Sequence, residues 1–149
     1  EKEGTDTMEE DLKKLYDEGK KAFGFYCGKG EWFLLTLKNI DFMSQMLPDV
    51  SKASQSLDVS VLHTLILEKI FGIDKENMAK QINLTYTKFF TEAIDGVDKG
   101  EFQCSFVLNP TRVTEIRDVA AAGEKMPQKS TYFYPKMITG MVMNNLGVD

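Results

Sequence analysis

Apolar residues recur at helical spacing in the first half of the chain. Residues 8–21 alternate acidic residues and lysines around a narrow apolar stripe, which predicts a surface helix. The pattern is strongest over 59–71, where apolar residues lie three and four positions apart. Asp58 can accept hydrogen bonds from the free amides at the start of this second helix, so it is the expected N-cap. Gly72 can adopt the left-handed conformation that ends it.

Between these helices lies a segment with the pattern of a β-hairpin. Its sequence, KAFGFYCGKGEWFLLTLK, has two aromatic-rich runs that flank the tripeptide Gly28-Lys29-Gly30. Aromatic side chains suit the half-buried surface of a sheet, and glycines supply the positive φ angles that a tight turn needs. We therefore expect a hairpin over 22–38. The polar residues 39–57 that follow predict a connection with about one helical turn.

Strand and helix patterns alternate in the second half of the chain. INLTY, at 82–86, predicts a short strand, and the segment from Thr87 to Gly100 predicts a helix. The run EFQCSFVL alternates strictly, so 102–108 is expected to be a strand in the same sheet as the hairpin. The side chains expected on one face of this strand are Phe102, Cys104, Phe106 and Leu108.

A further helix is predicted over 110–122. Pro110 lacks a backbone N–H and has a fixed φ, so it suits the first helical position, with Asn109 before it as the cap. Gly123 is expected to close the helix. The residues expected on its buried stripe are Val113, Ile116 and Ala120.

The order of these elements predicts an α+β fold. A hairpin is followed by alternating helices and strands, which indicates a mostly antiparallel sheet with an N-terminal hairpin and helices packed on it. The 149 residues fit a single domain, 1–149, that is large enough to bury a core. Because the chain begins at Glu1 inside a charged stretch, we interpret it as a domain cut from a longer protein.

Composition and charge narrow the range of partners. The net charge is -5, whereas a protein that binds nucleic acid presents a basic face to the phosphates. Apolar runs stay well short of the roughly 20 residues that a membrane helix requires. We expect a cytoplasmic protein with neither a nucleic-acid nor a membrane partner. Cys27 and Cys104 have no CxxC or Cys-rich context, so we expect both to be reduced thiols that face the core, with a disulfide as the alternative.

The segment GEKMPQKSTYFYPKM, residues 123–137, differs from the rest of the chain in its lysines, prolines and hydroxyl side chains. Gly123 and the pair Lys129-Ser130 approach the spacing of a phosphate-binding P-loop. The match fails because Gln128 replaces the second glycine and Pro127 removes a backbone donor. A P-loop also follows a strand and precedes a helix, which is the reverse of the order predicted here.

Phosphate binding through another geometry stays open. Between 119 and 148 the charged residues are three lysines and one glutamate, a local net charge of +2. The Lys129 ammonium and the Ser130 and Thr131 hydroxyls are suitable donors to an anionic oxygen. Pro127 and Pro135 restrict the backbone on both sides of these donors. The alternative is a solvated loop that leads into a strand, whose aromatic residues 132–134 pack on the core.

His63 is the only histidine of the chain and lies at the edge of the strongest helical stripe. One imidazole without neighbouring ligands does not make a metal site, so no metal is expected. Two interpretations remain: a core-edge histidine bonded to the backbone, and a catalytic base.

Three stretches together resemble the C-terminal half of the bacterial and archaeal domain of unknown function 1015 family. They are LDVSVLHTLILEKIFGI, the longer stretch FVLNPTRVTEIRDVAAAGEKMPQKSTYFYPK, and TGMV. The resemblance covers most of the chain from about Asp58 onward, and MPQKSTYFYPK is its most specific part. It implies that this chain is the C-terminal part of a protein more than twice as long, whose N-terminal half is the partner missing here.

The resemblance also implies a cytoplasmic protein associated with serine metabolism and with a kinase-like activity on free serine. It places His63, Asn109, Lys129, Ser130 and Thr131 at family motif positions without assigning their roles.

Two classes of function follow from the sequence. In the first, the chain is half of an enzyme, a transferase or kinase, that binds a phosphorylated small molecule or nucleotide. Lys129, Ser130, Thr131 and Asn109 would contact the anion, with His63 as the catalytic candidate. In the second, the chain is a non-catalytic domain that packs on the missing N-terminal half and stabilises it. The Met-rich segment KMITGMVMNN would then belong to an interface. No cofactor is implied in either case.

Overall fold

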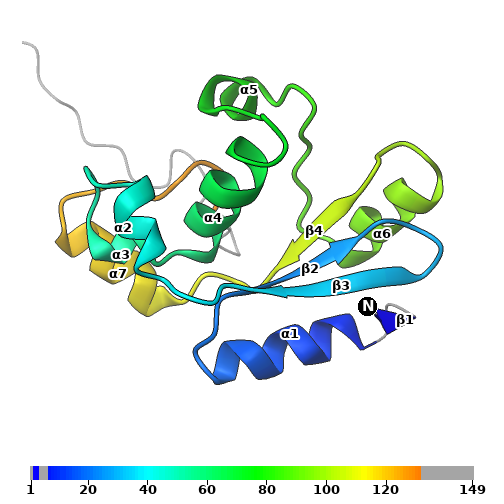
Figure 1. Cartoon of the computed structure of the whole chain (residues 1–149), viewed down its shortest axis with the longest axis horizontal. Coiled ribbons are helices and arrows are strands. Elements are labelled where there is room, and N and C mark those ends of the chain that lie inside the picture. Colours follow the sequence, from blue (N-terminus) through cyan, green and yellow to red (C-terminus); the bar gives the residue numbers. More distant parts are fainter. Residues whose placement is uncertain (1, 4–6, 132–149) are drawn as a thin grey trace, which may run out of the picture.

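The computed structural model describes residues 2–3 and 7–131 of the chain. It has an antiparallel four-stranded sheet with the strand order β1-β3-β2-β4. The strands are β1 (Lys2–Glu3), β2 (Ala22–Tyr26), β3 (Glu31–Thr36) and β4 (Ser105–Leu108). Helices pack on this sheet, and the predicted α+β class with its hairpin, here β2–β3, is confirmed (Figure 1). The expected strand through 132–134 and the Met-rich segment lie outside the described residues.

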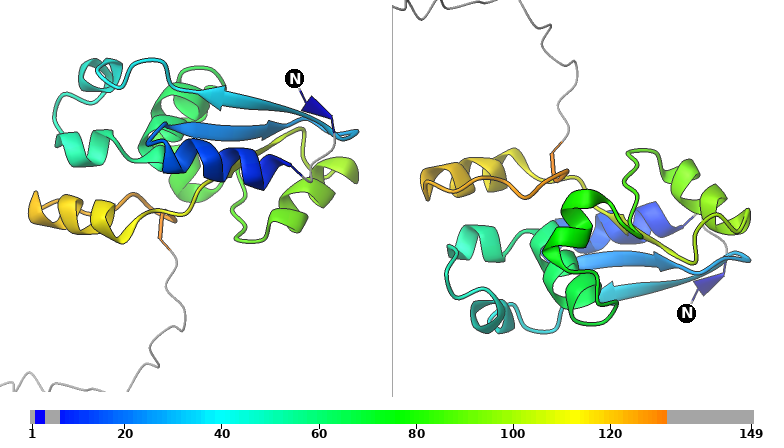
Figure 2. Two further views of the ribbon diagram at one scale, coloured as in Figure 1. Left: turned by 90° about the horizontal axis from the view of Figure 1, so that it is seen from below. Right: turned by 90° about the horizontal axis from the view of Figure 1, so that it is seen from above.

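One face of the sheet is covered by α1 (Met8–Asp17) and α6 (Phe90–Asp98). Figure 2 shows α1 in front of the strands in the view from below. Gly24 permits this close packing, because a Cβ atom at its position would lie 2.6 Å from Met8 Sδ. The buried residues of this core are Met8, Leu12, Ala22, Tyr26, Trp32, Ile94 and Val97.

The opposite face is covered by a continuous helical segment made of α4 (Asp58–Val61) and the π-helix η1 (Leu62–Glu68). This segment lies in front of the strands in the view from above (Figure 2). The predicted helix is therefore present, but most of it has the wider π geometry. Leu57 rather than Asp58 is its N-cap. The buried residues of this second core are Phe23, Met43, Val61, Leu62, Leu67 and Met78.

The hairpin turn has positive φ at Gly28 (99°), Lys29 (57°) and Gly30 (77°), as the glycine spacing predicts. The Tyr26 hydroxyl, buried beneath the turn, donates to Asp98 Oδ1 at 2.6 Å and accepts from the Gly30 amide at 3.0 Å. Burial raises the pKa of Tyr26 and the Asp98 carboxylate raises it further, so the hydroxyl remains a donor. These bonds join the hairpin to the end of α6.

Tyr26→Phe is expected to lower the free energy of unfolding by about 2 kcal/mol, because it removes a hydrogen bond to a carboxylate and leaves the Gly30 amide without its acceptor. Urea denaturation followed by tryptophan fluorescence would measure the change. Tyr86→Phe is the matched control, since the Tyr86 hydroxyl makes no hydrogen bond to the described residues. Equal effects of the two substitutions would contradict this role for Tyr26.

Short helices occupy segments that the sequence pattern assigned differently. The connection over 39–57 contains two of them, α2 (Phe42–Met46) and α3 (Lys52–Gln55), and the polar residues after Gly72 contain α5 (Lys75–Lys80). The predicted strand at 82–86 is wrong, because these residues form turns and irregular backbone. The prediction for 102–108 is confirmed only in part, since pairing with β2 covers 105–108.

The last described helix, α7, is Val113–Ala121, three residues later than predicted at its start. Asn109 does not cap it, because the Asn109 side chain donates to the Leu12 carbonyl of α1. Arg112 is the N-cap instead. The predicted stripe is wrong for Val113, which is 78% exposed, and for Ala120, whereas Ile116 is partly buried and the fully buried residue of the helix is Val119.

Beyond α7, the Glu124 carboxylate accepts hydrogen bonds from the Ser51 amide and hydroxyl and from the Ser54 hydroxyl. These bonds lower the pKa of Glu124 and attach the end of α7 to α3.

The two cysteines are free, as the redox prediction requires, but the prediction that both face the core is wrong. Cys27 follows β2 and is exposed, whereas Cys104 precedes β4 and is partly buried.

Candidate functional site

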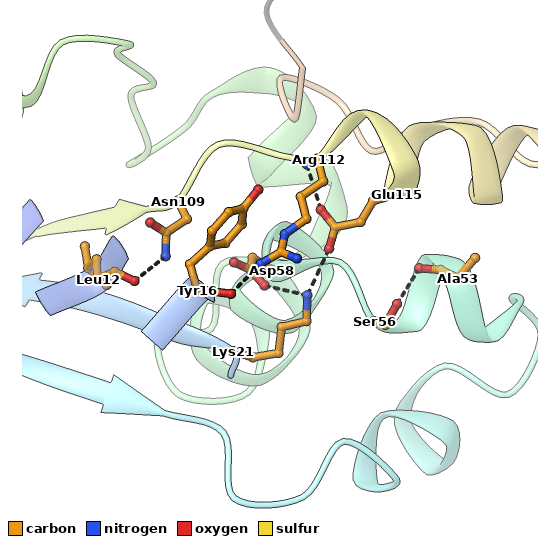
Figure 3. Close-up of polar contacts among 9 residues, drawn as sticks. All are labelled: Leu12, Tyr16, Lys21, Ala53, Ser56, Asp58, Asn109, Arg112 and Glu115. Carbon is orange, nitrogen blue, oxygen red and sulfur yellow. Dashed lines mark hydrogen bonds and ion pairs between the residues drawn. The ribbon is translucent and has the colours of Figure 1, made fainter. Parts of the chain in front are cut away.

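A cluster of charged residues lies where α1, the start of β2 and the start of α7 meet (Figure 3). After α1 the chain turns at Gly19, whose φ is +73°, and enters β2 through Lys20 and Lys21. From the other side, α7 begins after Arg112, whose backbone N–H donates to Glu115 Oε2 at 2.8 Å. The cluster is thus assembled from segments far apart in the sequence.

Lys21 is the centre of this cluster. Its Nζ lies 3.0 Å from Asp58 Oδ1 and 3.0 Å from Glu115 Oε1. The exposed fractions of the three side chains are 21%, 14% and 21%, so the charges are largely removed from water. Burial opposes the charge of Lys21, but the two carboxylates outweigh burial and raise its pKa. One ammonium therefore serves two acidic side chains.

Asp58 is the less well compensated carboxylate of the pair. Burial raises its pKa, against the opposing effect of Lys21, and the nearby charge of Glu115 raises it further. Its Oδ1 is buried with no aligned hydrogen-bond donor among the described residues, so the contact with Lys21 is an ion pair rather than a well-formed hydrogen bond. Asp58 therefore serves here as a buried counter-charge for Lys21.

Arg112 adds a second cation beside Lys21. Its guanidinium carbon lies 3.8 Å from the centre of the Tyr16 ring, and Nη2 donates to the Tyr16 carbonyl. Stacking on the ring and the bond to the backbone hold the planar guanidinium in place.

Two hollows lie on either side of Tyr16. The smaller has a volume of about 200 Å³ and is lined by charged and hydroxyl residues that include Lys20, Lys21, Arg112 and Thr114. The larger, of about 320 Å³, lies between α1 and the end of β4, and Asn109 is among its lining residues. We call the two together the α1–α7 groove. The smaller hollow is lined by three cations and the Glu115 carboxylate, and two of these cations, Lys20 and Lys21, are already paired with carboxylates.

The structure brings some of the sequence-predicted site residues near this groove. Asn109 lines the larger hollow, although its amide donates to the Leu12 carbonyl at 3.0 Å. Asn109 belongs to the loop between β4 and α7. Ser130 lies against this loop, because the Thr111 hydroxyl donates to the Ser130 carbonyl at 2.9 Å. The Ser130 hydroxyl itself donates to the Pro127 carbonyl. Lys129 is exposed in this turn with φ +60°, and Thr131 is partly buried.

His63 lies elsewhere, in η1, where its ring meets the edge of Tyr86 at a centroid distance of 6.3 Å. Burial lowers its pKa, so the imidazole is held neutral. Among the described contacts, none links His63 to Asn109 or to the 129–131 segment.

Sequence reasoning missed Lys21, Asp58, Arg112 and Glu115 as a group. Each of them has an ordinary local context, such as the residue before a strand or the first turn of a helix. The one local signal is Glu115 three residues after Arg112, the spacing of a side chain that bonds back to the start of a helix.

Fold and groove together define an α+β domain with a mixed-charge recess between two helices. Comparison of the chain with family models, curated proteins and solved structures found no match. Among the described residues, no helix has both the length and the apolar character needed to cross a membrane. The same residues contain no cluster of three or more side chains suited to bind a metal ion.

Proposed function

We propose that this chain is the C-terminal part of an enzyme that binds a phosphorylated small molecule or nucleotide, and that the α1–α7 groove contacts the anionic group. The observation that carries the proposal is the Arg112 guanidinium stacked on Tyr16 at the wall of a hollow that Lys20 and Lys21 also line. A fixed guanidinium and neighbouring ammoniums provide the charge-assisted hydrogen bonds that phosphate oxygens accept.

Because the groove carries both positive and negative charge, we further propose that it binds the molecule that accepts the phosphoryl group. A free amino acid carries both a carboxylate and an ammonium, and the groove has cations and the Glu115 carboxylate on one wall. This pairing is compatible with kinase-like activity on free serine, which the family resemblance implies. Phosphoryl transfer depends chiefly on positioning of the reactants and stabilisation of charge, and the cations and the carboxylate of the groove can provide both.

The segment 129–131 is the second anion-contacting element of the proposal. It adjoins the loop that carries Arg112, through the bond between Thr111 and Ser130. Lys129→Ala is expected to weaken phosphate-ligand binding by about 1.5–3 kcal/mol if a charge-assisted bond is lost, with little change in melting temperature. Lys20→Gln, in the groove, is expected to weaken it about tenfold.

Thermal shift and titration calorimetry with nucleotides, phosphoamino acids, pyrophosphate and free serine would test these expectations. Lys99→Gln is the matched control, since Lys99 directly follows the distant helix α6 and its side chain is 64% exposed. Weakening by Lys20→Gln alone would place the anion in the groove and not at 129–131. Unchanged affinity in both variants would contradict the proposal.

A second candidate is a non-catalytic domain that packs on a missing N-terminal half. The observation that favours it is a group of incompletely covered phenylalanines on the η1 side of the sheet. The Phe25 ring lies 5.0 Å from that of Phe106 and 6.1 Å from that of Phe33, and Phe71 meets Phe106 edge-on. Exposed apolar groups of this kind are typical of interaction surfaces. Failure of all ligands to bind, together with binding of the separately expressed N-terminal half, would support this function instead.

A further inference from the structure

Cys27 directly follows β2, and Cys104 directly precedes the neighbouring strand β4. The strands β2 and β4 lie side by side (Figure 1), and the last registered partners of this antiparallel pair are Tyr26 and Ser105. Each step forward along β2 corresponds to one step backward along β4, as the pairing of Phe25 with Phe106 shows. The next residues on the two segments are therefore Cys27 and Cys104, opposite each other.

Strand alternation places both thiols on the same side of the sheet. Cys27 shares a face with Phe25, and Cys104 shares a face with Phe106, which stacks on Phe25. The two cysteines thus continue the row of phenylalanines on the η1 side. Burial raises the pKa of Cys104, and the nearby charge of Cys27 raises it further, in agreement with a short separation of the two thiols.

The expected backbone separation suits a disulfide. Residues directly opposite in an antiparallel pair have Cα atoms about 4.5 or 5.5 Å apart, depending on their hydrogen bonding. Disulfides join Cα atoms about 4.4–6.8 Å apart. The Cys27 thiol donates to the Glu31 carbonyl at 3.7 Å, so rotation of its side chain away from this contact is the movement that the disulfide requires.

We propose that Cys27 and Cys104 form a redox-active dithiol, which a low-molecular-weight disulfide converts to an intramolecular disulfide. Cys27 is exposed and reacts first. Its thiolate attacks one sulfur of the reagent, forms a mixed disulfide and releases one reagent thiol. The Cys104 thiolate then attacks Cys27 Sγ, forms the Cys27–Cys104 bond and releases the second reagent thiol. The two protein thiols are oxidised, and the reagent disulfide receives the two electrons and the two protons.

The disulfide would tie β4 to the turn end of the hairpin and close a long loop of the chain. Closing a long loop restricts the unfolded chain, so the oxidised form is expected to unfold at a higher urea concentration than the reduced form. Cys27 and Cys104 would then respond to the redox state of the surroundings without any change in the strand order.

Incubation of the reduced native chain with excess glutathione disulfide would test the proposal. We expect loss of two hydrogen atoms in mass, no retained glutathione, and a peptide map that links Cys27 to Cys104. The matched variants Cys27→Ser and Cys104→Ser cannot close, so each is expected to retain one glutathione. In the wild type, the rate of disulfide closure should exceed the rate at which a second glutathione is added by about tenfold or more, because a tethered thiol has a high effective concentration.

The wild-type measurements do not depend on folding of the variants. Circular dichroism before and after oxidation, which should be unchanged, confirms that the reaction takes place in the folded chain. Retention of two glutathiones by the wild type, a disulfide between two molecules, or no reaction would each overturn the proposal.

Discussion

Replacing Lys21 with Met is expected to lower the free energy of unfolding by about 3–5 kcal/mol at neutral pH. The substitution keeps the aliphatic volume of the side chain but removes the one ammonium that lies 3.0 Å from both Asp58 and Glu115. Two carboxylates would then remain close together and largely out of water with their main counter-charge lost. Urea denaturation of the wild type and of the variant would measure the difference.

The difference should depend on pH in a defined direction. As the pH falls, Asp58 takes up a proton at a higher pH than a free aspartate does, because its pKa is raised, so the variant loses part of its penalty and approaches the wild type. The raised pKa of Lys21 means that its contribution is fully present below its ordinary pKa. That contribution is lost as the pH rises through the raised value. The raised pKa of Asp58 likewise contributes stability at acid pH that is lost as the pH rises through it. The difference in the free energy of unfolding between the wild type and the variant should therefore be greatest at pH values above the pKa of Asp58 and below the pKa of Lys21.

Lys20→Met is the matched control for this experiment. Lys20 is adjacent in sequence, but its ion pair with Glu18 is solvent-exposed, and such pairs contribute about 0–1 kcal/mol. A loss of stability for Lys21→Met that is no larger than for Lys20→Met would contradict the structural role of the cluster. So would a loss that stays constant from pH 4 to pH 8.

Gly24→Val is expected to destabilise the domain by about 3 kcal/mol, through overpacking. A Cβ atom at this position would lie 2.6 Å from Met8 Sδ and 3.0 Å from Met8 Cγ, and Met8 is fully buried. Either α1 must move away from the sheet or Met8 must leave its site. Both changes open the core that contains Trp32, so urea denaturation with tryptophan fluorescence reports the effect directly.

Two further variants isolate the cause. Thr36→Val introduces the same side chain at an exposed position of β3 and is expected to change stability by less than about 0.5 kcal/mol. Met8→Ala destabilises the wild type by leaving a cavity, but in the Gly24→Val background it makes room for the new side chain. The double variant should therefore be more stable than the sum of the single effects predicts. Strict additivity would show that the close contact between Met8 and Gly24 is not the source of the loss.

The elements with a strong local cause were determined by the sequence alone. The hairpin follows from two aromatic-rich runs around glycines whose φ angles are positive in the structure, and the long helical segment after Leu57 follows from apolar spacing. Strict alternation likewise located β4. In each case the period of the side chains along the chain matches the backbone geometry, so no distant contact is needed to predict the element.

Tertiary contacts alone decided which of these patterns became buried or paired. INLTY has the composition of a strand but pairs with no described strand. The face of α7 that packs on the domain contains Val119 and not Val113, so Val119 is the buried residue. Asn109, a plausible cap by its position, is held by a carbonyl of α1.

The charged cluster and the opposed cysteines depend on distant contacts in the same way. Lys21, Asp58 and Glu115 come from three separate segments of the chain, and Cys27 is placed opposite Cys104 only by the register of β2 with β4. Local periodicity records which way a side chain points from its own backbone. Local periodicity does not specify which distant segment will pack opposite that side chain. Charge compensation and thiol pairing both depend on this packing.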